Sequence, residues 1–149
     1  MDHLTKSQRH YNMSRIRSVS KPEIALRSRL HRMGFRFRKN DSELPGSPDI
    51  VFPKYGAVVF VNGCFWHGHR YCHKFRIPST HVRFWRHKFA VNRRRDRANT
   101  ALLQEAGWRV GVVWECSITG RNRERRLDTV AGELALWLEE GLAESYIEF

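Results

Sequence analysis

Residues 62–75, NGCFWHGHRYCHKF, bring metal-ligating and aromatic side chains into one short segment. Thiolate and imidazole groups together are typical of tetrahedral zinc, and a structural zinc site uses four protein ligands. The segment holds two of the chain's three cysteines, and the third follows a predicted strand in the sequence WEC. The predicted ligands are Cys64, His69, Cys72 and Cys116. His67 and His73 compete for the histidine position, and the alternative to zinc is a set of buried free thiols.

A second set of side chains has the chemistry of a metal-dependent nuclease. Asp49 begins a predicted strand directly after a proline, and a carboxylate there suits magnesium, which neutralises phosphate charge and helps to activate water. In PD-(D/E)xK nucleases the next strand carries E-x-K, but here residues 59–62 read VFVN. Glu23 as a second carboxylate and His67 as a general base would complete the site. Otherwise Glu23 is half of a capping box, Asp49 a turn residue and His67 a spare zinc ligand.

The composition favours a polyanionic partner. Formal net charge is +12, from 27 Lys and Arg against 15 Asp and Glu. Such a balance favours nucleic acid, and the alternative is a ribosomal or merely soluble basic protein. Three cysteines cannot all pair within one chain, which argues against a disulfide framework. The polar start predicts no signal peptide, and no apolar run predicts a membrane span, so we expect a cytoplasmic protein.

Hydrophobic periodicity divides the chain into helices and strands. Ser20 as N-cap and Gly34 as C-terminal glycine bound the first helix. The predicted helices are 20–34, 80–106 and 123–140, and the predicted strands are 35–38, 49–52, 57–63 and 107–115. The apolar positions predicted to face inward are Leu26, Leu30 and Met33, then Phe84, Val91, Ala98 and Leu102, then Leu127, Val130, Leu134 and Leu138.

This element order predicts one mixed α/β sheet with helices packed on it. Residues 57–63 are nearly all apolar, as a central strand buried on both faces would be. Trp108 and Trp114 are predicted to lie in the core. Residues 1–19 are polar and basic and predict a flexible N-terminal arm, which leaves residues 20–149 as a single domain.

Four stretches, LPGSPDIV, FVNGCFWHGH, RFW and GWRVGVVWEC, resemble those of very-short-patch repair endonucleases. The resemblance covers about residues 7–140. It implies a restriction-endonuclease-like fold and an enzyme that nicks one strand of duplex DNA at a thymine opposite a guanine. Such mispairs arise when 5-methylcytosine deaminates. It further implies functional links to a cytosine methyltransferase and to repair proteins, and a bacterial, nucleoid-associated location.

The resemblance also assigns roles to residues. Asp49 is similar to the family's magnesium ligand, His67 to its catalytic histidine, and Glu23 to the helix glutamate that helps organise water at the metal. Val61 would offer its backbone carbonyl to the magnesium ion. The cysteine and histidine set described above is similar to the family's structural zinc ligands. The residues similar to the aromatics that wedge into the base stack are Phe65, Trp66 and Trp85, for which the alternative is core packing.

Two positions depart from the family pattern. Asn62 stands where a second histidine near the phosphate is expected, and Cys72 comes one residue later than expected. The basic run Arg93, Arg94 and Arg95 predicts phosphate contacts, or else a solvated helix face. A single nick needs only a monomer, which we expect. The competing functions are a sequence-specific nicking endonuclease on matched or modified DNA, and a non-catalytic zinc-stabilised DNA-binding module.

Overall fold

The computed structural model describes residues 5–8, 21–140 and 144–149 of the chain. Most of the predicted N-terminal arm, 1–19, and the predicted cap Ser20 lie outside these residues. The helices are α2 (Lys21–Arg32), α3 (Val82–Glu105) and α4 (Arg123–Glu140). The strands are β1 (Arg38–Lys39), β2 (Ile50–Phe52), β3 (Ala57–Asn62), β4 (Arg109–Trp114) and β5 (Tyr146–Glu148). No helix in the described part of the chain is long and apolar enough to cross a bilayer.

The strands form one mixed sheet in the order β1-β2-β3-β4-β5. The pairs β1–β2 and β2–β3 are antiparallel, and the pairs β3–β4 and β4–β5 are parallel. Parallel neighbours need a long connection, which α3 provides between β3 and β4. β3 lies at the centre of the sheet and its first three residues are fully buried, as predicted for residues 57–63.

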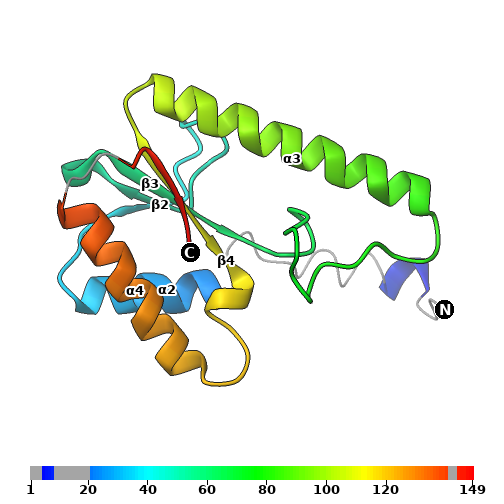
Figure 1. Ribbon diagram of the computed structural model, residues 1–149, viewed down its shortest axis with the longest axis horizontal. Helices are drawn as coiled ribbons and strands as arrows, with labels where there is room; N and C mark the ends of the chain where they lie inside the picture. Colours follow the sequence, from blue (N-terminus) through cyan, green and yellow to red (C-terminus); the bar gives the residue numbers. More distant parts are fainter. Residues whose placement is uncertain (1–4, 9–20, 141–143) are drawn as a thin grey trace.

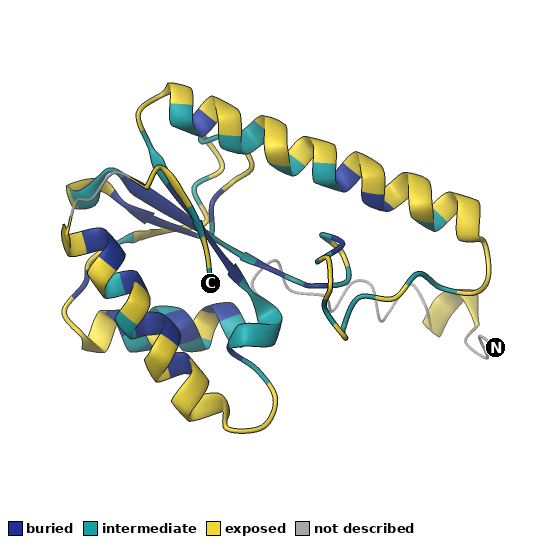
Figure 2. Ribbon diagram, viewed as in Figure 1, coloured by how far each residue is buried: buried dark blue, intermediate teal, exposed yellow. Residues whose placement is uncertain are grey.

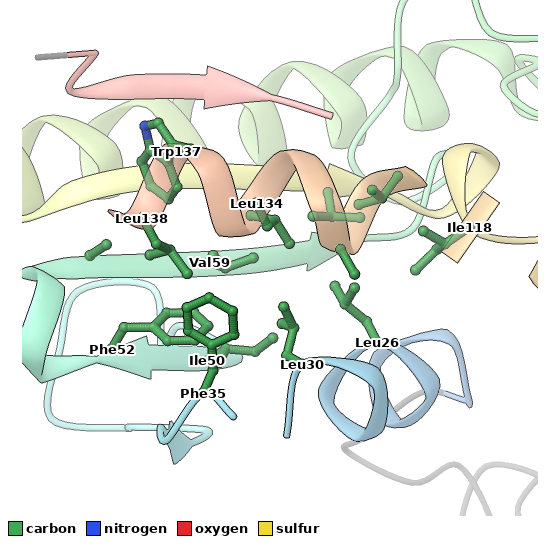
Figure 3. Close-up of a cluster of buried hydrophobic side chains, with 14 of the residues drawn as sticks. Leu26, Leu30, Phe35, Ile50, Phe52, Val59, Ile118, Leu134, Trp137 and Leu138 are labelled. Atoms are coloured by element: carbon green, nitrogen blue, oxygen red, sulfur yellow. The ribbon is translucent and has the colours of Figure 1, made fainter. Parts of the chain in front are cut away.

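The main core lies where α2 and α4 cover one face of the sheet (Figures 1 and 3). Alternate residues of β2 point to this face, so Ile50 and Phe52 pack there while Val51 packs on the other face. Arg29 of α2 ties the two helices together by ion pairs with Glu124 and Asp128 of α4. The apolar positions predicted for α4 are all buried, and they are Leu127, Val130, Leu134 and Leu138.

Helix α3 runs along the opposite face (Figures 1 and 2). It packs on the sheet through Leu103 near its C-terminal end, and it contacts the loop after β3 through Phe89 and Asn92. Its buried residues are Phe89, Asn92 and Leu103. The predicted inward set was wrong, because Phe84, Val91, Ala98 and Leu102 are all exposed. The physical reason is that the middle of this helix faces a cavity lined by polar groups, so its inner face is polar rather than apolar.

Other details also differ from the predictions. β5 lacks an apolar run, so the sequence does not predict it. The strand expected at 35–38 is wrong in its limits, because β1 begins at Arg38 and ends at Lys39. Met33 is 45% exposed, because α2 ends at Arg32 and the chain turns away. Trp108 and Trp114 are half-buried rather than core residues, since both flank the α3 face of the sheet.

Candidate active site and metal centre

The four predicted zinc ligands come together after β3 and after β4. The ligand atoms of Cys64, His69, Cys72 and Cys116 all lie within 4.8 Å of one another. A tetrahedral zinc ion with Zn–S bonds of about 2.3 Å holds its ligand atoms about 3.8 Å apart, so a small closure of the cluster would suffice. The geometry selects His69 from the three candidate histidines, and its Nδ1 lies 3.6 Å from Cys116 Sγ.

The thiols differ in how readily they lose a proton. Burial raises the pKa of Cys64 to about 12, and burial also raises the pKa of Cys116. Burial opposes the thiolate of Cys72 as well, but the backbone N–H of Lys74 and hydrogen bonds from the other two thiols outweigh it and lower its pKa. Burial likewise lowers the pKa of His69, which favours the neutral imidazole that a metal requires.

Neighbouring side chains support the cluster. The indole of Trp114 stacks on the imidazole of His69 with ring centroids 3.9 Å apart and planes inclined by 4°. Lys74 Nζ donates to Thr119 Oγ1 at 2.6 Å and lies 3.7 Å from Glu115 Oε1. Burial and the Cys72 thiol raise the pKa of Cys116, and the Cys64 thiol and the positive charge of Lys74 only partly offset this rise. These contacts hold the loop after β3 against the end of β4.

Tyr71 lies in the loop between His69 and Cys72. Tyr71 has a φ angle of 60°, a left-handed conformation that is uncommon for a residue with a side chain. Its side chain projects fully into solvent, with a relative exposure of 104%. The loop therefore brings His69 and Cys72 together and exposes one aromatic ring to solvent.

His67 leaves the metal cluster and pairs with a carboxylate of α3. Its Nδ1 lies 2.7 Å from Asp96 Oδ2, and both side chains are about one-quarter to one-third exposed, at 27% and 33%. A carboxylate on one ring nitrogen fixes the orientation of the imidazole and leaves Nε2 to exchange a proton with a reacting group. The pair therefore has the arrangement of a positioned general base.

Helix α3 holds the segment around His67 by two further contacts. Asn92 Nδ2 donates to the backbone oxygen of Trp66 at 2.9 Å. Arg93 donates from Nε and Nη2 to the backbone oxygen of Gly68, at 3.0 and 2.6 Å. The backbone on both sides of His67 is thus tied to the helix that carries Asp96.

Asp49 lies at the entry to β2, with its carboxylate beside β3. Its Oδ2 accepts a hydrogen bond from the backbone N–H of Val61 at 2.6 Å. The side chain is half-buried, and carboxylate and carbonyl oxygens are the ligands that magnesium prefers. Glu23 sits in the first turn of α2 and is only 2% exposed. Asp49 and Val61 are therefore neighbours, and Glu23 is enclosed in the fold.

A cavity of about 1000 Å³ opens between α3, the loop after β3 and the sheet. His67 and Asp96 line it, and so does Asn62, the residue at the end of β3 that is 9% exposed. α3 and β5 add polar side chains to its wall, including Asn99, Gln104 and Glu148. The sheet adds apolar side chains, which are Phe60, Val112 and Trp114. The histidine–carboxylate pair therefore faces an open space that can admit a ligand.

Phe65, Trp66 and Trp85 form one aromatic cluster next to His67. The ring centroids of Phe65 lie 5.1 Å from Trp66 and 5.4 Å from Trp85, and Phe89 supports the cluster from below at 5.2 Å from Phe65. Phe65 and Trp85 are half-buried, whereas Trp66 is 56% exposed. Phe84, which was predicted to face inward, adds a second exposed ring at 5.3 Å from Trp85.

The arginine run divides into three different settings. Arg93 points to Gly68, Arg94 is exposed, and Arg95 donates from Nη2 to Asn92 Oδ1 at 3.2 Å. The run is therefore not one uniform solvated face.

Sequence reasoning missed Asp96, although a signal was present. It is the single acidic residue inside NRRRDR, and an isolated carboxylate in a basic run often has a specific partner. It also missed the contribution of β5, whose Tyr146 and Glu148 line the cavity. A short terminal strand with mixed polarity carries no periodicity by which to recognise it.

Comparison with known proteins identifies the family. A family model described as DNA mismatch endonuclease Vsr matches residues 1–74. The type II nicking enzyme V.XorIIP of Xanthomonas oryzae pv. oryzae is 46% identical over 119 residues, which are 79% of this chain and 87% of that protein. The DNA mismatch endonuclease Vsr of Escherichia coli is 40% identical over 139 residues, 86% of each chain. The type II nicking enzyme V.NmeAIP of Neisseria meningitidis is 45% identical over 121 residues, 80% of this chain and 86% of that protein.

These similarities span most of the chain and include the loop that carries the histidine and cysteine residues. Taken with the mixed sheet, the clustered ligands and the paired histidine, they show that this chain belongs to the Vsr family of DNA mismatch endonucleases.

Proposed function

We propose that the protein is a magnesium-dependent endonuclease that nicks one strand of duplex DNA at a T:G mismatch left by deamination of 5-methylcytosine. The observation that carries the proposal is the 2.7 Å contact between His67 and Asp96 in a cavity next to the Asp49 strand. The name of the E. coli relative, a DNA mismatch endonuclease, supports the mismatch as substrate.

The residues beside β2 and β3 fit a magnesium ion. Asp49 offers a carboxylate and Val61 a backbone carbonyl, both hard oxygen ligands. When bound, magnesium supplies charge neutralisation at the phosphate and lowers the cost of activating water. Glu23, as the helix glutamate, is proposed to help organise water in this site.

His67 is proposed to act as the general base. With Nδ1 held by Asp96, Nε2 accepts a proton from the water that attacks phosphorus. The bond from this water oxygen to phosphorus forms, the bond to the leaving oxygen breaks, and the leaving oxygen takes a proton from solvent water. Asp96 stabilises the imidazolium produced and keeps the ring aligned. Asn62, in place of a second histidine, can donate a hydrogen bond from its amide to a phosphate oxygen but cannot supply a general acid.

Phe65, Trp66 and Trp85 are proposed to wedge between base pairs at the mispair. Apolar side chains that enter a base step unstack it at a cost of about a few kcal/mol, and a mismatch is the cheapest place to do so. The exposed indole of Trp66 supports a leading position for that ring. The exposure of Trp66 argues against simple burial of the whole cluster in the core.

Zinc is the proposed occupant of the cluster formed by the three cysteines and His69. The four ligand types and their mutual distances fit tetrahedral zinc, and a site closed by four protein ligands is structural. Because His67, Phe65 and Trp66 lie between Cys64 and His69, the metal would fix the positions of the base and the wedge together.

The remaining parts of the proposal concern the cellular setting. We propose that the protein acts as a monomer, with residues 20–149 as the catalytic domain and 1–19 as a basic arm on the DNA. Basic side chains including Arg93, Arg94 and Arg95 are proposed phosphate contacts. The proposed substrate implies a cytosine methyltransferase as source of the lesion, downstream repair proteins, and action at the bacterial nucleoid.

A second candidate function is nicking of matched DNA at a specific sequence. The names of two relatives, type II nicking enzymes of Xanthomonas and Neisseria, favour it. A binding module without activity is disfavoured, because it has no need for a carboxylate placed on His67.

The chemistry is tested with an end-labelled duplex that carries one T:G mispair in varied flanking sequence. We expect a nick beside the thymine with magnesium, no nick in EDTA, and no nick with the Asp49→Ala variant. Retarded but uncut DNA in the presence of magnesium would overturn the catalytic proposal and favour the binding module.

A further inference from the structure

Three guanidinium groups converge beside the zinc loop without an acidic partner. Arg70 follows the predicted zinc ligand His69, while Arg93 and Arg97 lie one turn apart on α3, and all three line the same cavity. Among the described residues none of the three forms an ion pair. Asp96, the nearest acidic residue along the helix, is engaged with His67. Positive charges gathered in this way repel one another and attract an anion.

Arg93 is the fixed member of the group. Its Nε and Nη2 both donate to the backbone oxygen of Gly68, and its guanidinium lies over the ring of Phe75 at 5.3 Å. The remaining nitrogen, Nη1, makes no hydrogen bond to the described residues. Burial lowers the pKa of Arg93, and the charges of Arg70 and Arg97 lower it further, which supports their mutual proximity.

Gly68 allows this anchor to form. Its φ angle of 59° is left-handed, and a Cβ at this position would lie 2.8 Å from Arg93 Nε and Nη2. A side chain at residue 68 would therefore push the guanidinium away from the carbonyl. The backbone next to His67 and the direction of Arg93 are coupled through this one contact.

Tyr71 stands at the rim of the same cavity. Its ring is fully exposed, and its left-handed backbone lies between His69 and Cys72, two members of the metal cluster. An exposed hydroxyl beside a guanidinium group is a common donor to DNA phosphate oxygens. The additional loop residue thus adds a neutral donor next to the three charges.

From this arrangement we propose that Arg70, Arg93, Arg97 and Tyr71 form a binding site for one backbone phosphodiester of duplex DNA, close to but separate from the scissile phosphate. The backbone oxygen of Gly68 holds Arg93 in place before DNA binds. Arg70 and Arg97 add two further positive charges, and Tyr71 adds a neutral hydrogen-bond donor. The site rests on the proposed function, because it assumes DNA as substrate, and it assigns the lengthened zinc loop a role in positioning that DNA.

The test measures equilibrium binding to a T:G duplex and to a matched T:A duplex in EDTA, over a series of salt concentrations. Each phosphate neutralised contributes about 0.9 to the slope of log K against log salt concentration. We expect Arg70→Ala and Arg97→Ala each to lower that slope by up to about one such contribution. Tyr71→Phe should weaken binding and leave the slope unchanged, because a neutral donor releases no counterion.

Arg125→Ala is the matched control, since it removes an exposed arginine from α4 on the other face of the sheet. Arg70 borders two zinc ligands, so zinc content and thermal unfolding are measured for each variant. If Arg70→Ala loses zinc, the salt slope of Arg97→Ala is the result that tests the site, because Arg97 lies on α3 outside the loop.

A neutral methylphosphonate placed at successive positions of the duplex locates the phosphate. At one position of the duplex, the methylphosphonate should weaken binding by the wild-type protein and leave binding by Arg97→Ala unchanged. The proposed site would be overturned if the salt slope of Arg97→Ala equalled that of the wild type. It would also be overturned if Arg125→Ala lowered the slope as much as Arg97→Ala does. This binding test does not depend on nicking. A protein that binds as expected here but fails to cut the T:G duplex in the nicking assay would contradict the proposed activity and leave the phosphate site standing.

Discussion

His67 and Asp96 are 29 positions apart in the sequence and 2.7 Å apart in space. We expect His67→Ala to reduce the single-turnover nicking rate by about 10² to 10⁴-fold, the usual contribution of a general base. Asp96→Asn should slow nicking less, and the double variant should be no slower than His67→Ala, because both act through one proton transfer. Quenched-flow kinetics would check this, with Glu105→Gln, exposed at the end of α3, as control. Losses that multiply in the double variant would mean that Asp96 acts independently.

The thiols provide a second prediction at this scale. In metal-free protein at neutral pH we expect an alkylating reagent to modify Cys72 first, because its pKa is lowered and its side chain is half-buried. Cys64 should react last, since its pKa is raised to about 12 and its exposure is 1%. Raising the pH should therefore speed modification of Cys64 much more than that of Cys72.

Peptide mass spectrometry of timed samples would give the order of modification. With one equivalent of zinc, all three thiols should be protected together. Modification of Cys116 or Cys64 before Cys72, or protection of only one thiol by zinc, would contradict the shared metal centre.

The sequence predicts the three cysteines of the cluster because the chain contains only three. It leaves three histidines of residues 62–75 as candidates, and the fold places His69 among the thiols. The sequence does not predict Asp96, because the partner of His67 depends on how α3 crosses the sheet. The same limit applies to Trp114, whose stacking on His69 arises because the end of β4 meets the loop after β3.

At the scale of elements, α4 stabilises the fold by its buried face. Leu134 is fully buried between the sheet and α2, so Leu134→Ala should lower the free energy of unfolding by about 2 to 5 kcal/mol through lost transfer energy and a cavity. Leu136, two residues away and 58% exposed, gives the matched control. Leu136→Ala should change the free energy of unfolding by less than about 0.5 kcal/mol. Urea unfolding followed by circular dichroism measures both. Equal effects would mean that the two faces of α4 have been interchanged.

The helices and central strands are predictable from periodicity because they bury regular apolar faces. Helix α3 has the right limits but the wrong predicted face. Its inner side is polar where it lines the cavity, so Asn99 and Thr100 face inward while Val91 and Leu102 face solvent. β5 depends on backbone pairing, with Phe149 N donating to Val112 O at 2.8 Å, and such pairing leaves no pattern in side chains.

At the scale of the whole molecule, a net charge of +12 should govern affinity for DNA. If about 6 to 10 phosphates are neutralised, the binding constant should fall by about 10³ to 10⁵-fold between about 50 and 200 mM salt. Fluorescence anisotropy with a labelled duplex would measure the fall. Affinity that is nearly independent of salt would contradict electrostatic binding, and bovine serum albumin at the same concentration controls for nonspecific signal.

The central claim is that the mispair itself, read by the aromatic wedge, selects the site of cutting. The most direct measurement is competitive nicking of two duplexes that differ only in T:G against T:A, with distinguishable labels in one magnesium-containing reaction. The account predicts a much larger kcat/KM for the T:G duplex and a smaller ratio for Trp66→Ala, which removes the exposed ring. Equal kcat/KM for the two duplexes with the wild-type protein would contradict mismatch recognition and identify a nicking enzyme for matched sequence.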